Sequence, residues 1–402
     1  GLITTLLEMC FANTEGGMEI NLDKIKCDDI VKILFAENPG VVIQVADKHK
    51  AEVKKILEDA GVGYVKIGVP TEERHILATL HDATYQFGID YLRDVWYSTS
   101  YLLDRKQSMN GCAKKRFENY KQQPLEVVFD KSFTGKLSQF GLDPDRRTPS
   151  GIKAAIIREK GTNGEREMAY MLYLAGFDVK DVTMTDLVSG RETLEDINMV
   201  VYCGGFSNSD VLGSAKGWAG SFLFNPKAKA ALDNFYARED TLSLGVCNGC
   251  QLMMELGLIT PEDKKKGKML HNDSHKFESA FLGVTVPMNR SVMFGSLSGS
   301  KLGIWVAHGE GKFSLPYPED HYNVVLKYSY DEYPGNPNGS DYSVAGIASQ
   351  DGRHLAMMPH LERACFPWEN AYYPLDRKDN DQITPWMEAF VNARKWVEAH
   401  KK

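Results

Sequence analysis

The sequence predicts an α/β protein in which a mostly parallel sheet, from Gly151 onward, follows a smaller α+β unit and a helical connector. The chain has 402 residues, more than one ordinary core accommodates, so two domains are the expected arrangement. After Gly151, short apolar strands alternate with amphipathic helices, which is the pattern of a parallel sheet. Two glycine-rich segments directly follow such strands, where sheets of this type bind ligands.

Composition and charge exclude several classes of function. Hydrophobic residues make up 43% and charged residues 25% of the chain, as in an average globular protein. A formal net charge of −7 without clustered Lys and Arg argues against a nucleic-acid partner. No apolar stretch approaches the roughly 20 residues of a membrane-spanning helix, so no membrane partner is expected. The seven scattered cysteines indicate reduced thiols in a cytoplasmic protein.

Residues 1–90 are expected to form the α+β unit. Apolar residues at helical spacing alternate here with short β-branched runs, and turn signals such as Pro39-Gly40 and Gly61 separate them. We expect helices over Leu6–Phe11, Asp28–Ala36 and Lys50–Ala60, and strands over Val41–Val45 and Tyr64–Ile67.

Residues 91–150 are assigned as a helical connector with a linker. Residues 151–402 are assigned as the main domain. The helical pattern runs without a break from Tyr91 to Tyr120, and a looser stretch containing glycine and proline ends at Ser150. In the main domain we expect a helix over Glu165–Ala175 and strands over Ala154–Ile157, Phe177–Val179, Met199–Tyr202 and Leu242–Val246.

The segment from Gly245 to Gln251 has the pattern of a nucleophile elbow. A strand turns sharply into a helix at Cys247, and glycines stand two residues to either side of the thiol. A helix N-terminus at this place favours the thiolate and offers backbone N–H groups to an oxyanion. The alternatives for the Cys247-x-x-Cys250 pair are a redox couple, half of a zinc site, or an inert buried pair; no second CxxC is present. No metal site is expected.

Two further segments complete a constellation around Cys247. Gly204-Gly205 follows a strand and is either a simple tight turn or a second source of oxyanion donors. A run from Arg353 to Met358, after an Asp-Gly turn, predicts a hairpin strand that ends near His360. In extended chain, residues two apart face the same side, so Glu362 is expected beside the His360 ring, where a carboxylate fixes the tautomer.

Together these motifs resemble those of the triad glutamine amidotransferases, whose elbow reads G-x-C-x-G-x-Q and whose base reads H-x-E. The resemblance extends to the phosphoribosylformylglycinamidine synthase family in its large single-chain form. The matching segments are Leu92–Trp96, Gly204–Asp210, Cys247–Gln251, Asn272–Glu278, His308–Gly311, Asn336–Gly339 and Met358–Arg363. The departures are Asn208-Ser209 in place of a usual Tyr-Gly, Leu361 in place of Pro, and Lys276 in place of Arg.

This resemblance implies a flavodoxin-like glutaminase domain over 151–402, with glutamine as its substrate. Cys247 would be the nucleophile, His360 the acid and base, and Glu362 the residue that orients it. Backbone N–H groups of Gly205 or Phe206 and of Asn248 would form the oxyanion hole. Gln251, His308 and Gly309 would bind glutamine. The alternatives are another triad-type amidotransferase, a cysteine peptidase of the same fold, or a non-catalytic scaffold module.

The resemblance also implies what lies outside this chain. Residues 1–90 resemble the C-terminal part of a synthetase-type domain, like that of aminoimidazole ribonucleotide synthetase. The chain opens on Gly1 without an initiator Met, so we expect that a synthetase portion of the same polypeptide is missing. ATP and Mg²⁺ are implied for the full-length enzyme, which converts formylglycinamide ribonucleotide to formylglycinamidine ribonucleotide in purine biosynthesis. No cofactor is expected in this chain itself.

Overall fold

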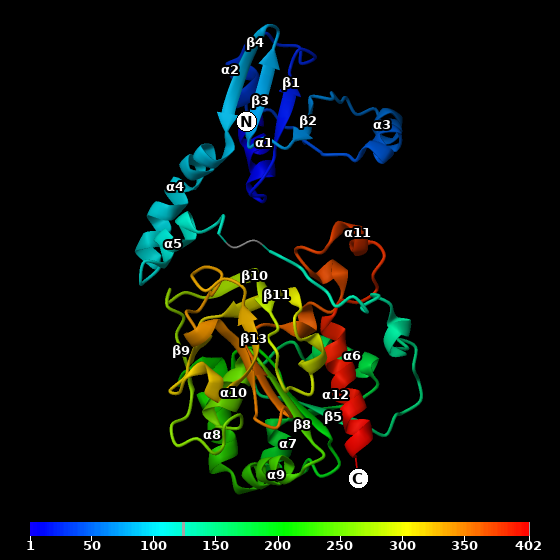
Figure 1. The fold of residues 1–402 in the computed structure, drawn as a ribbon, viewed down its shortest axis with the longest axis vertical. Helices are drawn as coiled ribbons and strands as arrows, with labels where there is room; N and C mark the ends of the chain where they lie inside the picture. Colours follow the sequence, from blue (N-terminus) through cyan, green and yellow to red (C-terminus); the bar gives the residue numbers. More distant parts are fainter. Residues whose placement is uncertain (123–124, 402) are drawn as a thin grey trace. The chain divides into compact units, whose positions relative to one another are not determined.

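The computed structural model describes residues 1–122 and 125–401 (Figure 1). It divides the chain into two compact units, Gly1–Lys106 and Gln107–Lys402. The connector expected over 91–150 includes residues 123 and 124, which lie outside the described residues. In the described part of the chain, no helix combines the length and the apolar character needed to cross a bilayer.

The first unit is a four-stranded sheet covered by helices. Its strands, in the order β2-β1-β3-β4, are β2 (Gly68–Thr71), β1 (Gly17–Asn21), β3 (His75–Leu80) and β4 (Ala83–Gly88). β1 and β3 pair in parallel, and the other two pairings are antiparallel. The helices α1 (Leu2–Phe11) and α2 (Ile30–Phe35) bury Leu6 and Leu34 against Ile20 and Ile76.

Two strands expected in this unit do not form. Val41–Val45 and Tyr64–Ile67 are irregular, although α3 (Lys50–Asp59) between them forms as predicted. Val41 is 89% exposed, and Val41–Val45 pairs with no strand in the described part of the chain. Tyr64–Ile67 reaches β1 only at its last residue, where the Asn21 N–H donates to the Ile67 carbonyl at 2.6 Å. β-branched residues favour a strand through contacts with cross-strand neighbours, so propensity without a partner is insufficient here.

The helical connector also differs from its prediction. The structure has two helices, α4 (Ile89–Gln107) and α5 (Cys112–Glu118), in place of one continuous helix. Asn110 and Gly111 separate them, and both adopt positive φ, at 54° and 72°. A left-handed pair of residues cannot continue a right-handed helix, so one continuous helix does not form across this pair.

The second unit contains a nine-stranded sheet in the order β11-β10-β13-β14-β15-β8-β7-β5-β6. Five neighbouring strands are parallel: β6 (Asp178–Thr183), β5 (Lys153–Arg158), β7 (Met199–Tyr202), β8 (Leu242–Val246) and β15 (His354–Met357). Numbered along the chain, their order is 2-1-3-4-5, which is the flavodoxin-like arrangement. The predicted α/β class is therefore confirmed, and β7 and β8 have the predicted bounds.

An antiparallel extension completes this sheet. It consists of β14 (Val344–Ala348), β13 (Asn323–Tyr328), β10 (Glu278–Thr285) and β11 (Lys301–His308). The extension curls, because Trp305 of the edge strand β11 forms a bridge with His360, just beyond β15. The His360 N–H donates to the Trp305 carbonyl at 2.9 Å. This closure brings the last residues of β11 to the carboxyl ends of the parallel strands.

Helices cover the parallel strands on both faces, as a sheet with strands buried on both sides requires. α6 (Glu165–Ala175) and α12 (Trp386–His400) pack on each other. A second layer contains α7 (Met184–Ser189), α8 (Lys216–Phe224), α9 (Pro226–Ala237) and α10 (Asn248–Glu255). The crossover from β5 to β6 and the next, from β6 to β7, run in opposite directions along the sheet. Connections of the usual right hand then place the two helix layers on opposite faces (Figure 1).

Smaller elements complete the description. β9 (Lys268–Leu270) and β12 (Lys312–Ser314) form a two-stranded sheet, and α11 (Leu375–Lys378) is a single turn. Short 3-10 helices cover Asp47–His49, Leu137–Phe140, Ser207–Asp210, Gly295–Leu297, Glu319–His321, Asp341–Ser343, Leu361–Arg363 and Pro367–Glu369.

The junction of β8 with α10 yields a stability prediction. A Cβ atom on Gly249 would overlap the backbone carbonyl of Tyr202 in the neighbouring strand. We therefore expect Gly249→Ala to lower the free energy of unfolding by about 1–3 kcal/mol, as overpacking of a core does. Gly295→Ala is the matched control, because the nearest atom to a Cβ there is 3.9 Å away. Urea denaturation of both variants measures the effect, and equal midpoints would contradict the prediction.

Candidate active site

Cys247 occupies a strained position between β8 and α10. Its φ of 53° and ψ of −106° lie in a region that residues with a side chain rarely adopt. Glycines are required on both sides of it: a Cβ on Gly245 would stand 2.5 Å from the Gly249 carbonyl oxygen, and Gly249 itself packs against Tyr202. The predicted elbow is therefore present, with the thiol at the N-terminus of α10.

The Cys247 thiol faces the curled end of the sheet. Its Sγ donates to the carbonyl oxygen of Ala307 at 3.6 Å, and the side chain is only 5% exposed. Cys250, the second cysteine of the CxxC pair, is fully buried in α10, and burial raises the pKa of its thiol well above the usual value. The two cysteines thus have different environments, and both are free thiols.

His360 and Glu362 form a buried pair next to the elbow. The His360 Nδ1 lies 2.6 Å from the Glu362 Oε1, and the two side chains are 2% and 1% exposed. Because an ionised carboxylate only accepts, Nδ1 carries the hydrogen that is donated. The sequence suggested that His360 and Glu362 meet because they are two residues apart in extended chain, but the contact arises in a different way. His360 is extended, and Leu361–Arg363 then coils into a 3-10 turn that brings the carboxylate back to the ring.

Electrostatics favour the protonated form of His360. Burial alone would lower its pKa, but the negative charge of Glu362 and the interaction with Cys247 outweigh burial and raise the pKa to about 10. At neutral pH the ring is therefore an imidazolium positioned between a carboxylate and a thiol.

The Gly204-Gly205 turn lies against these side chains. A Cβ on Gly204 would stand 2.8 Å from His360 Cε1 and 3.4 Å from Cys247 Cβ, so no larger residue fits. Gly205, with φ of 117°, forms an antiparallel bridge with Thr162. The Phe206 N–H donates to the Gly161 carbonyl at 2.8 Å. In such a bridge the N–H of Gly205 itself points away from Thr162 and remains available.

A pocket of about 240 Å³ has Cys247 among its lining residues. Six of the residues predicted from the sequence line it, namely Gly205, Phe206, Cys247, Gln251, His308 and Gly309. Asn248, His360 and Glu362 are not among its lining residues. The other lining residues, for which no role was predicted from the sequence, are Asp210, Ser214, His271, His275, Lys276, Phe277, Ala307 and Glu310.

The first turn of α10 organises this pocket through two buried amides. Asn248 accepts from the Ser207 N–H at 3.0 Å and donates to Gln251 Oε1 at 2.9 Å. Gln251 in turn donates to the backbone carbonyl of Glu310 at 2.8 Å. Both ends of the Gln251 amide thus already contact protein groups, and this side chain connects the elbow with the loop after β11.

His308 lies in the pocket wall without a hydrogen-bond partner for either ring nitrogen in the described part of the chain. It is 2% exposed. Burial, reinforced by the charge of His360, lowers its pKa to about 3, so the ring is neutral and carries one donor and one acceptor. Buried polar atoms are normally satisfied, which makes this ring a candidate to bind a ligand.

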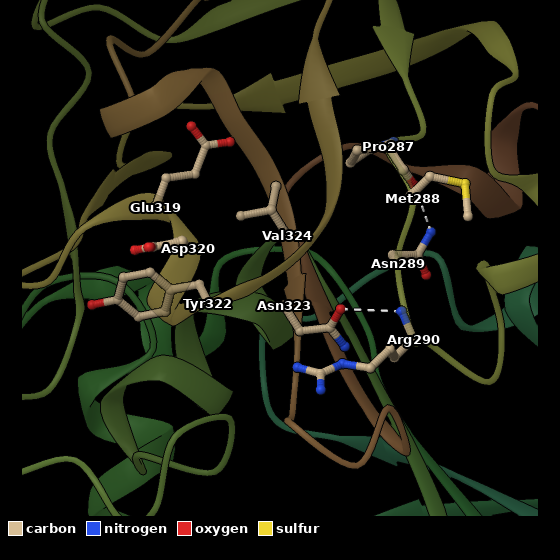
Figure 2. Close-up of a pocket in the computed structure, with 9 residues that line it drawn as sticks. All are labelled: Pro287, Met288, Asn289, Arg290, Glu319, Asp320, Tyr322, Asn323 and Val324. Carbon is tan, nitrogen blue, oxygen red and sulfur yellow. Dashed lines mark hydrogen bonds between the residues drawn. The ribbon is translucent and has the colours of Figure 1, made fainter.

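A larger hollow of about 600 Å³ lies elsewhere on the second unit (Figure 2). Its nine lining residues come from Pro287–Arg290 and from Glu319–Val324, and they include no cysteine, serine or histidine. The Arg290 N–H donates to Asn323 Oδ1 at 3.2 Å (Figure 2). Size does not identify the site here, because the smaller pocket contains the thiol. Among the described residues, no group of three or more His, Cys, Asp or Glu is arranged to bind a metal ion.

Comparison with known proteins agrees with this geometry. A family model described as the CobB/CobQ-like glutamine amidotransferase domain matches residues 151–397, and the chain belongs to this family. A model described as the C-terminal domain of AIR synthase related protein matches residues 1–81.

The chain is also similar to individual proteins. It is 38% identical over 432 residues to phosphoribosylformylglycinamidine synthase of Homo sapiens, covering 99% of this chain and 31% of the human protein. It is 37% identical to a probable phosphoribosylformylglycinamidine synthase, chloroplastic/mitochondrial, of Arabidopsis thaliana, covering 99% and 29% of the two chains. PurLQS from Thermotoga maritima is 26% identical, with a TM-score of 0.45, over 62% of this chain and 99% of that one. The resemblance inferred from the motifs is confirmed, and the chain spans about 30% of the length of the two relatives.

The raised pKa of His360 predicts how stability depends on pH. Because the folded-state pKa of about 10 exceeds the unfolded value of about 6.5, the stabilisation from His360 is fully present below pH 6.5. It is lost as the pH rises through 10. We expect the stability advantage of the wild type over Glu362→Gln to shrink between these values. Urea denaturation across this pH range measures the advantage, and a constant or growing difference would show that the pair does not couple.

Proposed function

We propose that this chain hydrolyses L-glutamine to L-glutamate and ammonia through a thioester on Cys247. The observation that supports this most directly is the placement of the Cys247 thiol beside the His360–Glu362 pair and at the floor of a pocket. A strained elbow, a base with an orienting carboxylate and a pocket are the components that nucleophilic acyl transfer needs.

In the first step the Cys247 thiolate attacks the carboxamide carbon of glutamine. The imidazolium of His360 stabilises the thiolate and then donates its proton to the departing nitrogen, so that ammonia leaves and a thioester remains. In the second step neutral His360 takes a proton from water, which attacks the thioester carbonyl and releases glutamate. Glu362 keeps the ring in one tautomer and stabilises its charged form throughout.

We assign the oxyanion hole to backbone N–H groups of Gly205 and Asn248. The N–H of Phe206 is the weaker candidate, because it already donates to Gly161. Asn248 is the first residue of α10, where backbone N–H groups lack partners within the helix and the helix dipole favours a negative charge. Each such donor contributes in the transition state, where the carbonyl oxygen becomes negative.

We assign glutamine binding to the pocket walls at Gln251, His308 and Gly309. Both ring nitrogens of neutral His308 lack a partner among the described residues, and they suit a ligand with both donors and acceptors, such as an amide. Gln251 acts mainly as a support, since its amide already joins Asn248 to the loop at Glu310.

The ammonia is proposed to serve the synthesis of formylglycinamidine ribonucleotide from formylglycinamide ribonucleotide, in purine biosynthesis. The names of the relatives and the match of residues 1–81 to an AIR synthase related domain support this over another triad-type amidotransferase. We assign the binding of ATP and Mg²⁺ to the part of the synthetase portion that this chain does not span, and none of it to this chain. A reducing, cytoplasmic setting would keep Cys247 as a thiol.

Substitution of the two neighbouring cysteines distinguishes this proposal from a redox pair and from a non-catalytic scaffold. We expect Cys247→Ala to abolish glutamate release, because no other thiol lines the pocket among its described residues. Cys250→Ser should retain at least about half of the activity, since this side chain points into the protein. The assay measures glutamate from glutamine by mass spectrometry. Equal loss in both variants would favour the redox pair, and unchanged activity in Cys247→Ala would rule out the thioester.

A second assay tests whether this chain alone only releases ammonia or also forms the ribonucleotide product. We expect glutamate release by the purified chain to be slow and to change less than about twofold when ATP and formylglycinamide ribonucleotide are added, because coupling needs both sites. No formylglycinamidine ribonucleotide should form, from glutamine or from ammonia. Chromatography of the reaction measures the product, and ATP-dependent product would place a synthetase site within these residues.

A further inference from the structure

Residues 272–278, which we call the rim segment, match the family, but the proposed reaction uses none of their side chains. Three of them, His275, Lys276 and Phe277, line the thiol pocket. His275 adopts a positive φ of 54°, which is uncommon for a residue with a side chain and persists only where the surroundings determine it. The contacts around the rim segment therefore decide the shape of this part of the pocket.

The rim segment is joined to the end of β11 at both of its ends. Asn272 is fully buried, and its Nδ2 donates to the carbonyls of Lys276 at 2.9 Å and of His308 at 2.7 Å. The Asn272 N–H donates to the Gly309 carbonyl at 2.9 Å. Glu278, the last residue of the segment, stands opposite His308 in the pairing of β10 with β11. A displacement of the rim segment would therefore also displace His308 and Gly309.

The turn before α5 is hydrogen-bonded to the rim segment, and both belong to the second unit. The Met109 N–H donates to the Ser274 carbonyl at 3.0 Å, and Asn110 Nδ2 donates to the Asp273 carbonyl at 2.8 Å. Asn110 is the first of the two left-handed residues between α4 and α5, so the turn that separates these helices also contacts the rim segment. The described lining of the pocket includes neither Met109 nor Asn110.

An ion pair attaches α5 itself to the end of the rim segment. Arg116 Nη2 donates to Glu278 Oε2 at 3.1 Å, and Glu278 is only 8% exposed. The Arg116 guanidinium also lies 5.0 Å from the centre of the Tyr333 ring, whose hydroxyl donates to Glu278 Oε1 at 3.1 Å. Removing one partner of a buried pair leaves an uncompensated charge, which costs far more than an exposed ion pair contributes. Loss of Arg116 should therefore displace Glu278 and the rim segment with it.

From these contacts we infer that Arg116 and Glu278 are positioning residues for the pocket, through which the connector helix α5 sets the affinity for glutamine. The inference rests on the proposed glutaminase function and specifies how a part of the chain outside the pocket regulates it. Cys247 is held separately, by the packing of β8 against α10. A displaced rim segment therefore weakens glutamine binding and leaves the thiol as reactive as before.

The test measures KM and kcat for glutamine in the full chain with Arg116→Ala, Glu278→Gln or both substitutions. We expect each single substitution to raise KM roughly threefold to tenfold and to leave kcat within about twofold, which is the signature of lost ground-state binding. The double variant should resemble the single variants, because both residues act through one pair. Arg116→Lys keeps the charge and should lie closer to the wild type than Arg116→Ala.

Protection of Cys247 by glutamine gives the same comparison without turnover. Iodoacetamide labelling of Cys247 is followed by intact-mass spectrometry and peptide mapping. The glutamine concentration that halves the labelling rate should rise by the same factor as KM, and the rate without glutamine should be unchanged. Lys114→Ala is the matched control, because it removes a charge from the same helix whose partner is the exposed Glu118, at 3.8 Å. It should behave as the wild type does.

Several outcomes would overturn the inference: an unchanged KM in both single variants, additive effects in the double variant, or an equal rise of KM in Lys114→Ala. Glu278→Gln keeps the shape of the buried side chain, so it decides the matter if Arg116→Ala does not fold. If the wild type releases glutamate in these cases, the proposed function stands. If it releases none but protection by glutamine shifts in the variants, the proposed function fails and the positioning role stands. If glutamine neither reacts nor protects, both fail.

Discussion

The backbone conformation of Cys247 is the constraint on which the second unit depends. A residue at φ 53° and ψ −106° costs about 1–3 kcal/mol, and it persists only where the surroundings determine it. Here β8 runs between two strands and is buried on both faces, and α10 packs so closely that Gly249 contacts Tyr202. The strain is thus maintained by the core, and it directs the thiol away from the core and into the pocket.

The local elements of the second unit could be predicted from sequence because they combine strong signals. Met199–Tyr202 and Leu242–Val246 are short, apolar and bounded by glycine or polar residues, and the structure gives them these bounds. Val41–Val45 has similar composition but forms no strand. The segments differ in whether another strand lies beside them to pair with. That depends on contacts between distant residues and cannot be recognised in the sequence of the segment itself.

The site could be predicted in part for the same reason. Cys247, Gly205 and the His360–Glu362 pair stand in compact motifs at strand ends, and the structure brings them together. Two other features depend on tertiary packing, so the sequence could not show them. They are the 3-10 turn at Leu361 and the hydrogen bond from the Phe206 N–H to the Gly161 carbonyl. Asp210 and Glu310 lie 100 positions apart, each within a segment that matches the family but without a predicted role of its own. Only the curl of β11 makes them neighbours.

The bridge between Trp305 and His360 has a mechanical consequence. The edge strand β11, whose last residues line the pocket, is joined to His360 by the backbone hydrogen bond from the His360 N–H to the Trp305 carbonyl. The carbonyl of Ala307, two residues along the same strand, accepts a hydrogen bond from the Cys247 thiol at 3.6 Å. One edge strand thus links the position of the His360 ring to that of the Cys247 thiol through its backbone.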